Sequence, residues 1–123
     1  MLSSLLLILS LNAPLALAAT ENFQCQDKSA AVTGSVESTR RPNVFTVTLR
    51  ALSGATQEFS ANPATGFDFN KDESISGYYD LSTANQHLAF ETRTRRDGTS
   101  YKQLTVQSSK LFGDTVMRTM PCL

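Results

Sequence analysis

The sequence predicts an all-β domain, a small antiparallel meander of about seven strands that forms a sandwich or a partly closed barrel. Short segments rich in Val, Thr, Phe and Tyr alternate with clusters of Gly, Pro, Asn and Asp, as strands and turns do. After the N-terminal segment no stretch keeps a helical period for more than about ten residues, so we expect at most a turn of helix, near residues 80–86. The two cysteines lie near opposite ends of the same region, which predicts terminal strands joined by a disulfide.

The strands can be placed by their alternation of apolar and polar residues. The clearest is Val44–Arg50, in which Phe, Val and Leu alternate with Thr and Arg. Ala31–Glu37 precedes it, and Arg40–Asn43 has the composition of the turn between them. Two further strands are expected around Ile75–Leu81 and Thr115–Cys122. The sequence therefore predicts one domain built from consecutive short strands.

Turn chemistry fixes the register of the hairpin that follows Val44–Arg50. A three-residue loop that ends in Gly54 places this glycine at the left-handed position that such a loop requires. Val47 then pairs with Phe59, and Thr48 pairs with Glu58. Apolar residues share one face of the hairpin and polar residues share the other, as a half-buried sheet needs.

The same argument registers a second hairpin further along the chain. A three-residue loop Arg96-Asp97-Gly98 sets Leu88 opposite Val106 and Phe90 opposite Leu104. A two-residue loop would split the apolar residues between the two faces, so we reject it. Two hairpins with the same turn chemistry favour a meander.

Residues 1–18 have the pattern of a cleaved signal peptide, and residues 19–123 form the single β domain. The apolar run Leu5–Leu9 is followed by Ala16-Leu17-Ala18, a small-x-small cleavage site. Polar residues and a proline interrupt the run before it reaches the about 20 residues that span a bilayer. We therefore expect a secreted or periplasmic protein without a membrane span after cleavage.

Cys25 and Cys122 are the two cysteines of the chain, and in an oxidising compartment they should pair. The disulfide would close a loop of about 100 residues. On the loop-entropy model, this restriction of the unfolded chain stabilises the fold by up to about 4.7 kcal/mol.

The charges of the 11 basic and 11 acidic residues cancel, so we expect no nucleic-acid partner. The chain has no Asn-x-Ser/Thr sequon, which favours a bacterial source.

The sequence gives little support for catalysis, and we expect neither enzymatic activity nor a cofactor. The single histidine, His87, falls on the outward face of its strand. The next acid on that face, Glu91, lies about 13 Å away along the strand, too far for a catalytic pair. Zinc is disfavoured because one histidine and two oxidised cysteines supply too few ligands.

A weak calcium candidate is formed by Asp68, Asn70 and Asp72, which place side-chain oxygens at every second position as an EF-hand loop does. Glu73 then stands where the loop needs glycine, and Tyr79 stands where it needs a bidentate glutamate. A solvated acidic loop is the simpler interpretation.

Arg93, Arg95 and Arg96 form the basic cluster of the second hairpin, with Arg93 opposite Tyr101. Such a pair can stack as cation over ring and offer a contact for a carboxylate, a phosphate or a glycan. The competing interpretation is that the basic hairpin serves solubility and protects a sheet edge.

A long loop at residues 62–79 is the second candidate surface, since long loops that carry aromatic residues are often functional. We expect Phe67 and Phe69 to close one end of the core, and Tyr78 and Tyr79 to be exposed for ligand binding.

These features favour an exported, non-catalytic, monomeric β domain that binds a protein or glycan partner, as an inhibitor or adhesion accessory. The alternatives are an envelope structural subunit that assembles through strand edges, and a small secreted hydrolase with an unrecognised site. A signal peptide, a β meander of about 100 residues and a terminal disulfide are similar in outline to small periplasmic inhibitors of lysozyme and proteases. The resemblance is one of architecture and assigns no residues.

Overall fold

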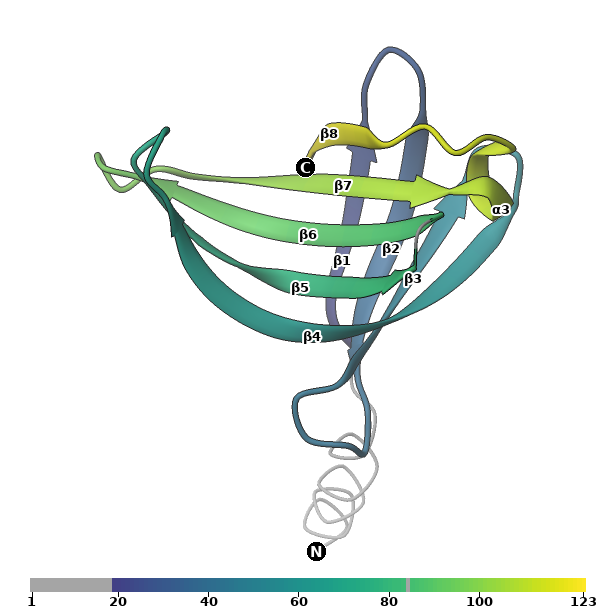
Figure 1. Cartoon of the computed structure of the whole chain (residues 1–123), viewed down its shortest axis with the longest axis horizontal. Coiled ribbons are helices and arrows are strands. Elements are labelled where there is room, and N and C mark those ends of the chain that lie inside the picture. The colour runs from purple at the N-terminus through teal and green to yellow at the C-terminus, as the bar shows by residue number, and fades with distance from the viewer. Residues whose placement is uncertain (1–18, 84) are drawn as a thin grey trace, which may run out of the picture.

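The computed structural model describes residues 19–83 and 85–123, which form a closed antiparallel barrel of eight consecutive strands (Figure 1). Each strand pairs with the next along the chain, and the last pairs with the first. The predicted all-β meander is therefore confirmed as a closed barrel, with one strand more than expected. The elements are β1 (Ala19–Gln26), β2 (Ala31–Ser38), β3 (Phe45–Ala51), β4 (Thr56–Asp68), β5 (Glu73–Thr83), β6 (Gln86–Arg95), β7 (Ser100–Ser108), α3 (Ser109–Phe112) and β8 (Arg118–Cys122).

Both predicted hairpin registers are confirmed. In β3–β4, Val47 lies opposite Phe59, and the loop closes through two hydrogen bonds of 2.9 Å, from Ala51 N–H to Ala55 C=O and from Gly54 N–H to Ala51 C=O. In β6–β7, Leu88 lies opposite Val106 and Phe90 opposite Leu104. The glycines that end the two loops have positive φ angles of 94° and 91°, the left-handed conformation that this turn type demands.

The barrel interior is filled by the inward-facing residues of the strands. Phe23 of β1 and Phe90 of β6 stack across it with ring centroids 3.9 Å apart. The short helix α3 follows β7 and buries Leu111 in the same core. Its N-terminus is capped by Ser108, whose Oγ accepts the Leu111 N–H at 3.1 Å. The helix turn thus lies after β7, and residues 80–83, where we expected it, belong to β5.

Gly34 leaves the space that the stacked rings need. A Cβ at this position would collide with the ring of Phe23 and lie 2.9 Å from Leu49 Cδ2. The ring cannot move away easily because it stacks on Phe90. We expect Gly34→Ala to lower the free energy of unfolding by about 1.5 kcal/mol, measured by urea denaturation. Gly66→Ala is the matched control, because a Cβ there meets nothing within 4 Å. An equal effect of both changes would contradict this packing.

Strands β4 to β7 continue beyond the barrel as a long curved sheet whose two hairpin tips lie together at one end (Figure 1). β3 pairs with β4 only as far as Ala61, and β8 pairs with β7 only from Lys102 onward. The predicted long loop at residues 62–79 is wrong, since these residues are the continuous β4–β5 hairpin with a turn of four residues, Phe69–Asp72. We call the region β4–β7 beyond the barrel the extension.

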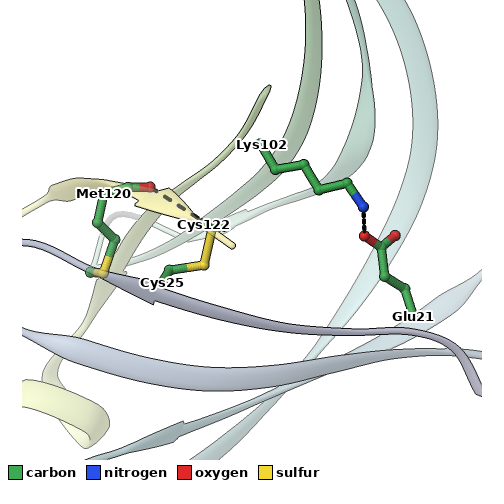
Figure 2. Close-up of a disulfide and its surroundings, with 5 residues drawn as sticks. All are labelled: Glu21, Cys25, Lys102, Met120 and Cys122. Carbon is green, nitrogen blue, oxygen red and sulfur yellow. Dashed lines mark hydrogen bonds and ion pairs between the residues drawn. A yellow bond between two sulfur atoms is a disulfide. The ribbon is translucent and has the colours of Figure 1, made fainter. Parts of the chain in front are cut away.

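The predicted disulfide between Cys25 and Cys122 is present and joins β1 to β8 (Figure 2). These cysteines are also the cross-strand partners at the seam where the barrel closes. Lys102 of β7 pairs with Glu21 of β1 near the same seam (Figure 2). Covalent and ionic links therefore hold the N-terminal strand to the C-terminal half of the sheet.

The predicted signal peptide, residues 1–18, lies outside the described residues. Within the described part of the chain, no helix has the length and apolar character needed to cross a membrane.

Candidate functional site

The outer face of the extension carries a network of charged and hydroxyl side chains centred on Arg93 of β6. Its Nη1 donates to Asp68 Oδ2 at 2.8 Å and to Glu73 Oε1 at 3.2 Å, and its Nε donates to Glu91 Oε1 at 3.2 Å. The side chain is only 11% exposed. Three carboxylates thus neutralise and cover Arg93, which lies opposite Tyr101 as predicted but is not a free binding residue.

Tyr101 and Arg95 complete the side of the network that faces β7. The Tyr101 hydroxyl donates to Glu73 Oε1 at 2.7 Å. The guanidinium of Arg95 lies over the Tyr101 ring, 4.4 Å from its centroid. Our expectation that Arg93 could stack on this ring is wrong, because Arg93 turns toward the carboxylates and the diagonal neighbour Arg95 takes its place.

Hydrogen bonding in the network shifts the pKa values of its members. The hydrogen bond from Tyr101 and the charge of Arg93 lower the pKa of Glu73, and the hydrogen bond from Arg93 lowers that of Asp68. Burial alone would lower the pKa of Arg93, but its hydrogen bonds to carboxylates outweigh this and raise it. Asp68, Glu73 and Arg93 therefore stay charged at neutral pH.

Tyr78 and Tyr79 point to opposite faces of β5, and neither is fully exposed. Tyr78 faces the barrel interior and packs edge-on against Phe45 at 5.0 Å. On the outer face the Tyr79 hydroxyl donates to Glu91 at 3.0 Å. Burial, together with the charge of Glu91, raises the pKa of Tyr79 to about 12. These tyrosines serve packing and the network, rather than forming the exposed pair that we expected.

The residues of the calcium candidate do not converge on a common point. Asp68 Oδ1 accepts the N–H groups of Asn70 and Lys71 at 3.0 and 3.2 Å, which builds the turn. Its other oxygen binds an arginine, and Asp72 pairs with Arg96 at 2.9 Å. The acidic side chains therefore face the protein's own cations. Among the residues that the structure describes, no cluster of three or more His, Cys, Asp or Glu could hold a metal ion.

The hairpin tips expose two phenylalanines that the sequence interpretation had assigned to the core. Phe67 is 45% exposed and Phe69 is 87% exposed, and their rings contact edge to face at 5.0 Å. The Arg96–Asp72 ion pair joins this tip to the β6–β7 tip. Phe67 and Phe69 thus stand on the extension, far along the sheet from the core cluster. We call Phe69, its neighbour Phe67, and Arg95 and Arg96 the tip surface.

A hollow of about 430 Å³ lies on the inner face where the extension leaves the barrel. Its walls combine hydroxyl groups with the ring of Tyr78 and the carboxylate of Glu21, which is engaged by Lys102. A second hollow of about 510 Å³ lies on the other face of the same strands, beside Tyr79 and Ile75. Both hollows are open and flank residues 64 and 65 of β4.

His87 lies on β6 opposite Gln107, the position expected from the sequence. His87 belongs to neither the network nor the tip surface.

Comparisons with models of protein families, with curated proteins and with solved structures found no match. The function must therefore be argued from the geometry of this chain.

Proposed function

We propose that this chain is an exported, non-catalytic β domain that binds a macromolecular partner, a protein or a glycan, in the envelope or the extracellular space. The observation that carries the proposal is the tip surface, in which Phe69 is 87% exposed at the end of a braced sheet. Export is supported by the signal-peptide pattern of residues 1–18 and by the disulfide, a bond typical of oxidising compartments.

A rigid aromatic ring in water exposes apolar surface, which is unfavourable in free energy and favours association. Such a ring therefore marks a surface that is suited to binding a partner. The turn that carries Phe69 is fixed by the Asp68 side chain and by the Arg96–Asp72 pair. Little conformational freedom is therefore left to lose on binding. Aromatic residues and arginine are also the types that most often dominate interface energies, and Arg95 and Arg96 lie on the neighbouring β6–β7 tip, which the Arg96–Asp72 pair joins to this turn.

The network beneath the tip gives the sheet its stiffness. The extension is a single layer without a hydrophobic core of its own, so side-chain pairs across the strands must stabilise it. Arg93 joins β4, β5 and β6 by bonding Asp68, Glu73 and Glu91. In this proposal Arg93 and Tyr101 position the tip surface, and Phe69, Arg95 and Arg96 make the contacts.

The proposal is tested by affinity capture from the source organism's envelope and culture fluid, with the mature protein as bait. A partner enriched by the wild type is expected to bind Phe69→Ala at least about tenfold more weakly, while circular dichroism and the unfolding midpoint stay unchanged. Leu52→Ala is the matched control, since Leu52 is 86% exposed in the β3–β4 turn. If the partner binds both variants as tightly as it binds the wild type, the tip surface is not its binding site.

A further inference from the structure

β4 has an open edge along residues 63–68, beyond Asn62, whose Nδ2 donates to the Asn43 C=O of the β2–β3 turn at 2.9 Å. Up to Ala61 one side of β4 pairs with β3, and the other side pairs with β5 from Asn62 to Asp68. Beyond Ala61 no strand within the described residues lies on the β3 side. The extension therefore presents an unpaired strand, the feature that natural β proteins usually cover or charge.

Pro63 shows which backbone groups face this open edge. A proline has no N–H to give to a ladder, so in a strand its nitrogen points away from the hydrogen-bonded neighbour. Pro63 lies opposite Tyr78 of β5, and its backbone groups therefore point to the open side. Because these directions alternate along an antiparallel strand, the backbone groups of Thr65 and Phe67 point there too.

The edge thus offers two donors, the N–H groups of Thr65 and Phe67, and three acceptors, the C=O groups of Pro63, Thr65 and Phe67. This set is complementary to itself when two copies run antiparallel about a two-fold axis at Thr65. The Thr65 residues of the two copies exchange both of their hydrogen bonds. Each Phe67 N–H then meets the Pro63 C=O of the other copy, so every open donor has a partner.

We propose that two copies of this chain associate by antiparallel pairing of their β4 edges, with the two-fold axis at Thr65. The two extensions then form one continuous sheet. On the inner face the ring of Phe67, which is 45% exposed in the single chain, packs on Pro63 of the other copy. Residues 62–67 carry no charge, so the paired segments of the two copies have no like charges to repel each other.

Such pairing goes beyond the proposed function and replaces the monomer that the sequence favoured. It is the kind of edge association that we considered for a structural subunit. Phe69 lies beyond the paired segment, in the turn, and stays exposed in the dimer. Partner binding through Phe69 and self-association through Thr65 can therefore be lost separately.

The test is sedimentation equilibrium of the mature protein over a concentration series, with the variants Thr65→Pro and Thr65→Val. The wild type is expected to show a monomer–dimer equilibrium. Thr65→Pro should weaken association at least about tenfold, because it removes the two central hydrogen bonds, one from each copy. Its unfolding midpoint should match that of the wild type, since among the described residues no strand pairs on the side of β4 to which this N–H points. Thr65→Val keeps the N–H and should associate like the wild type.

Amide hydrogen exchange followed by NMR checks the same contact without any substitution. The Thr65 and Phe67 amides should become protected as protein concentration rises, and the Leu52 amide, in an exposed turn, should not. A wild type that is monomeric throughout the series would overturn the proposal. So would a dimer that Thr65→Pro leaves intact, or one in which the Thr65 amide stays unprotected.

Discussion

Replacing both Cys25 and Cys122 with alanine is expected to lower the free energy of unfolding by about 4 kcal/mol. The two residues are 97 positions apart, so the bond removes much of the chain entropy of the unfolded state. It also joins the first and last strands, whose ladder has a single Cα pair in the described structure, Cys25 with Cys122. Without the bond, the seam is held by non-covalent contacts, among them the Lys102–Glu21 pair and a hydrogen bond from Leu123 N–H to Gln24 C=O at 2.8 Å.

Urea denaturation of the double variant beside the oxidised wild type measures this loss. The wild type unfolded in the presence of a reductant is the control, because it breaks the cross-link but keeps both sulfur atoms in place. Reduced wild type and double variant should agree to within about 1 kcal/mol. A reduced protein as stable as the oxidised one would show that the seam does not depend on the disulfide.

Arg93→Met is expected to destabilise the fold by about 2 to 3 kcal/mol at neutral pH. The change keeps most of the apolar stem but leaves Asp68, Glu73 and Glu91 close together without the cation that all three share. The effect falls below that of a fully buried pair because the network lies on an open face of the sheet. The sequence had instead indicated that Arg93 offers a contact for a ligand.

The same variant should change how stability depends on pH. The pKa values of Asp68 and Glu73 are lowered in the folded state, so their stabilising contribution is present above the unfolded pKa of about 4. It is lost as the pH falls through the lower, folded values. The gap between wild type and Arg93→Met should therefore be widest near pH 7 and narrow below about pH 4.

Arg50→Met is the control for this pair of measurements, since Arg50 is exposed on β3 and outside the network. It should unfold like the wild type at each pH. Equal stability of Arg93→Met and Arg50→Met, or a gap that does not change between pH 7 and pH 3, would show that the network does not stabilise the extension.

The barrel half of the molecule was predictable because its signals are local. Alternation in Val44–Arg50 identified β3, and glycine at the end of a three-residue loop fixed two registers that the structure reproduces. The disulfide followed from cysteine positions alone. The disulfide also predicted an N-terminal strand at Cys25, which is β1, but the bounds of this strand were not predicted because residues 19–26 carry few apolar residues.

The extension could not be predicted because its cause is non-local. Pro63 and Gly66 are residues typical of loops, yet β4 continues through them because β5, β6 and β7 pair alongside. The network joins residues up to 28 positions apart, from Glu73 to Tyr101. One signal was present in the sequence, since Asp68 two residues before Asn70 favours a tight Asx turn over a long loop.

The central claim, that the tip surface binds a macromolecular partner, is tested most directly by hydrogen exchange of the mature protein with and without the captured partner. Protection is expected in the β4–β5 turn around Phe69 and in the β6–β7 loop around Arg96, with little change in the barrel. The competing surface is the hollow of about 600 Å³ on β1–β3, which includes Thr33 and Arg50. Protection confined to that hollow, with both tips unchanged, would contradict the account.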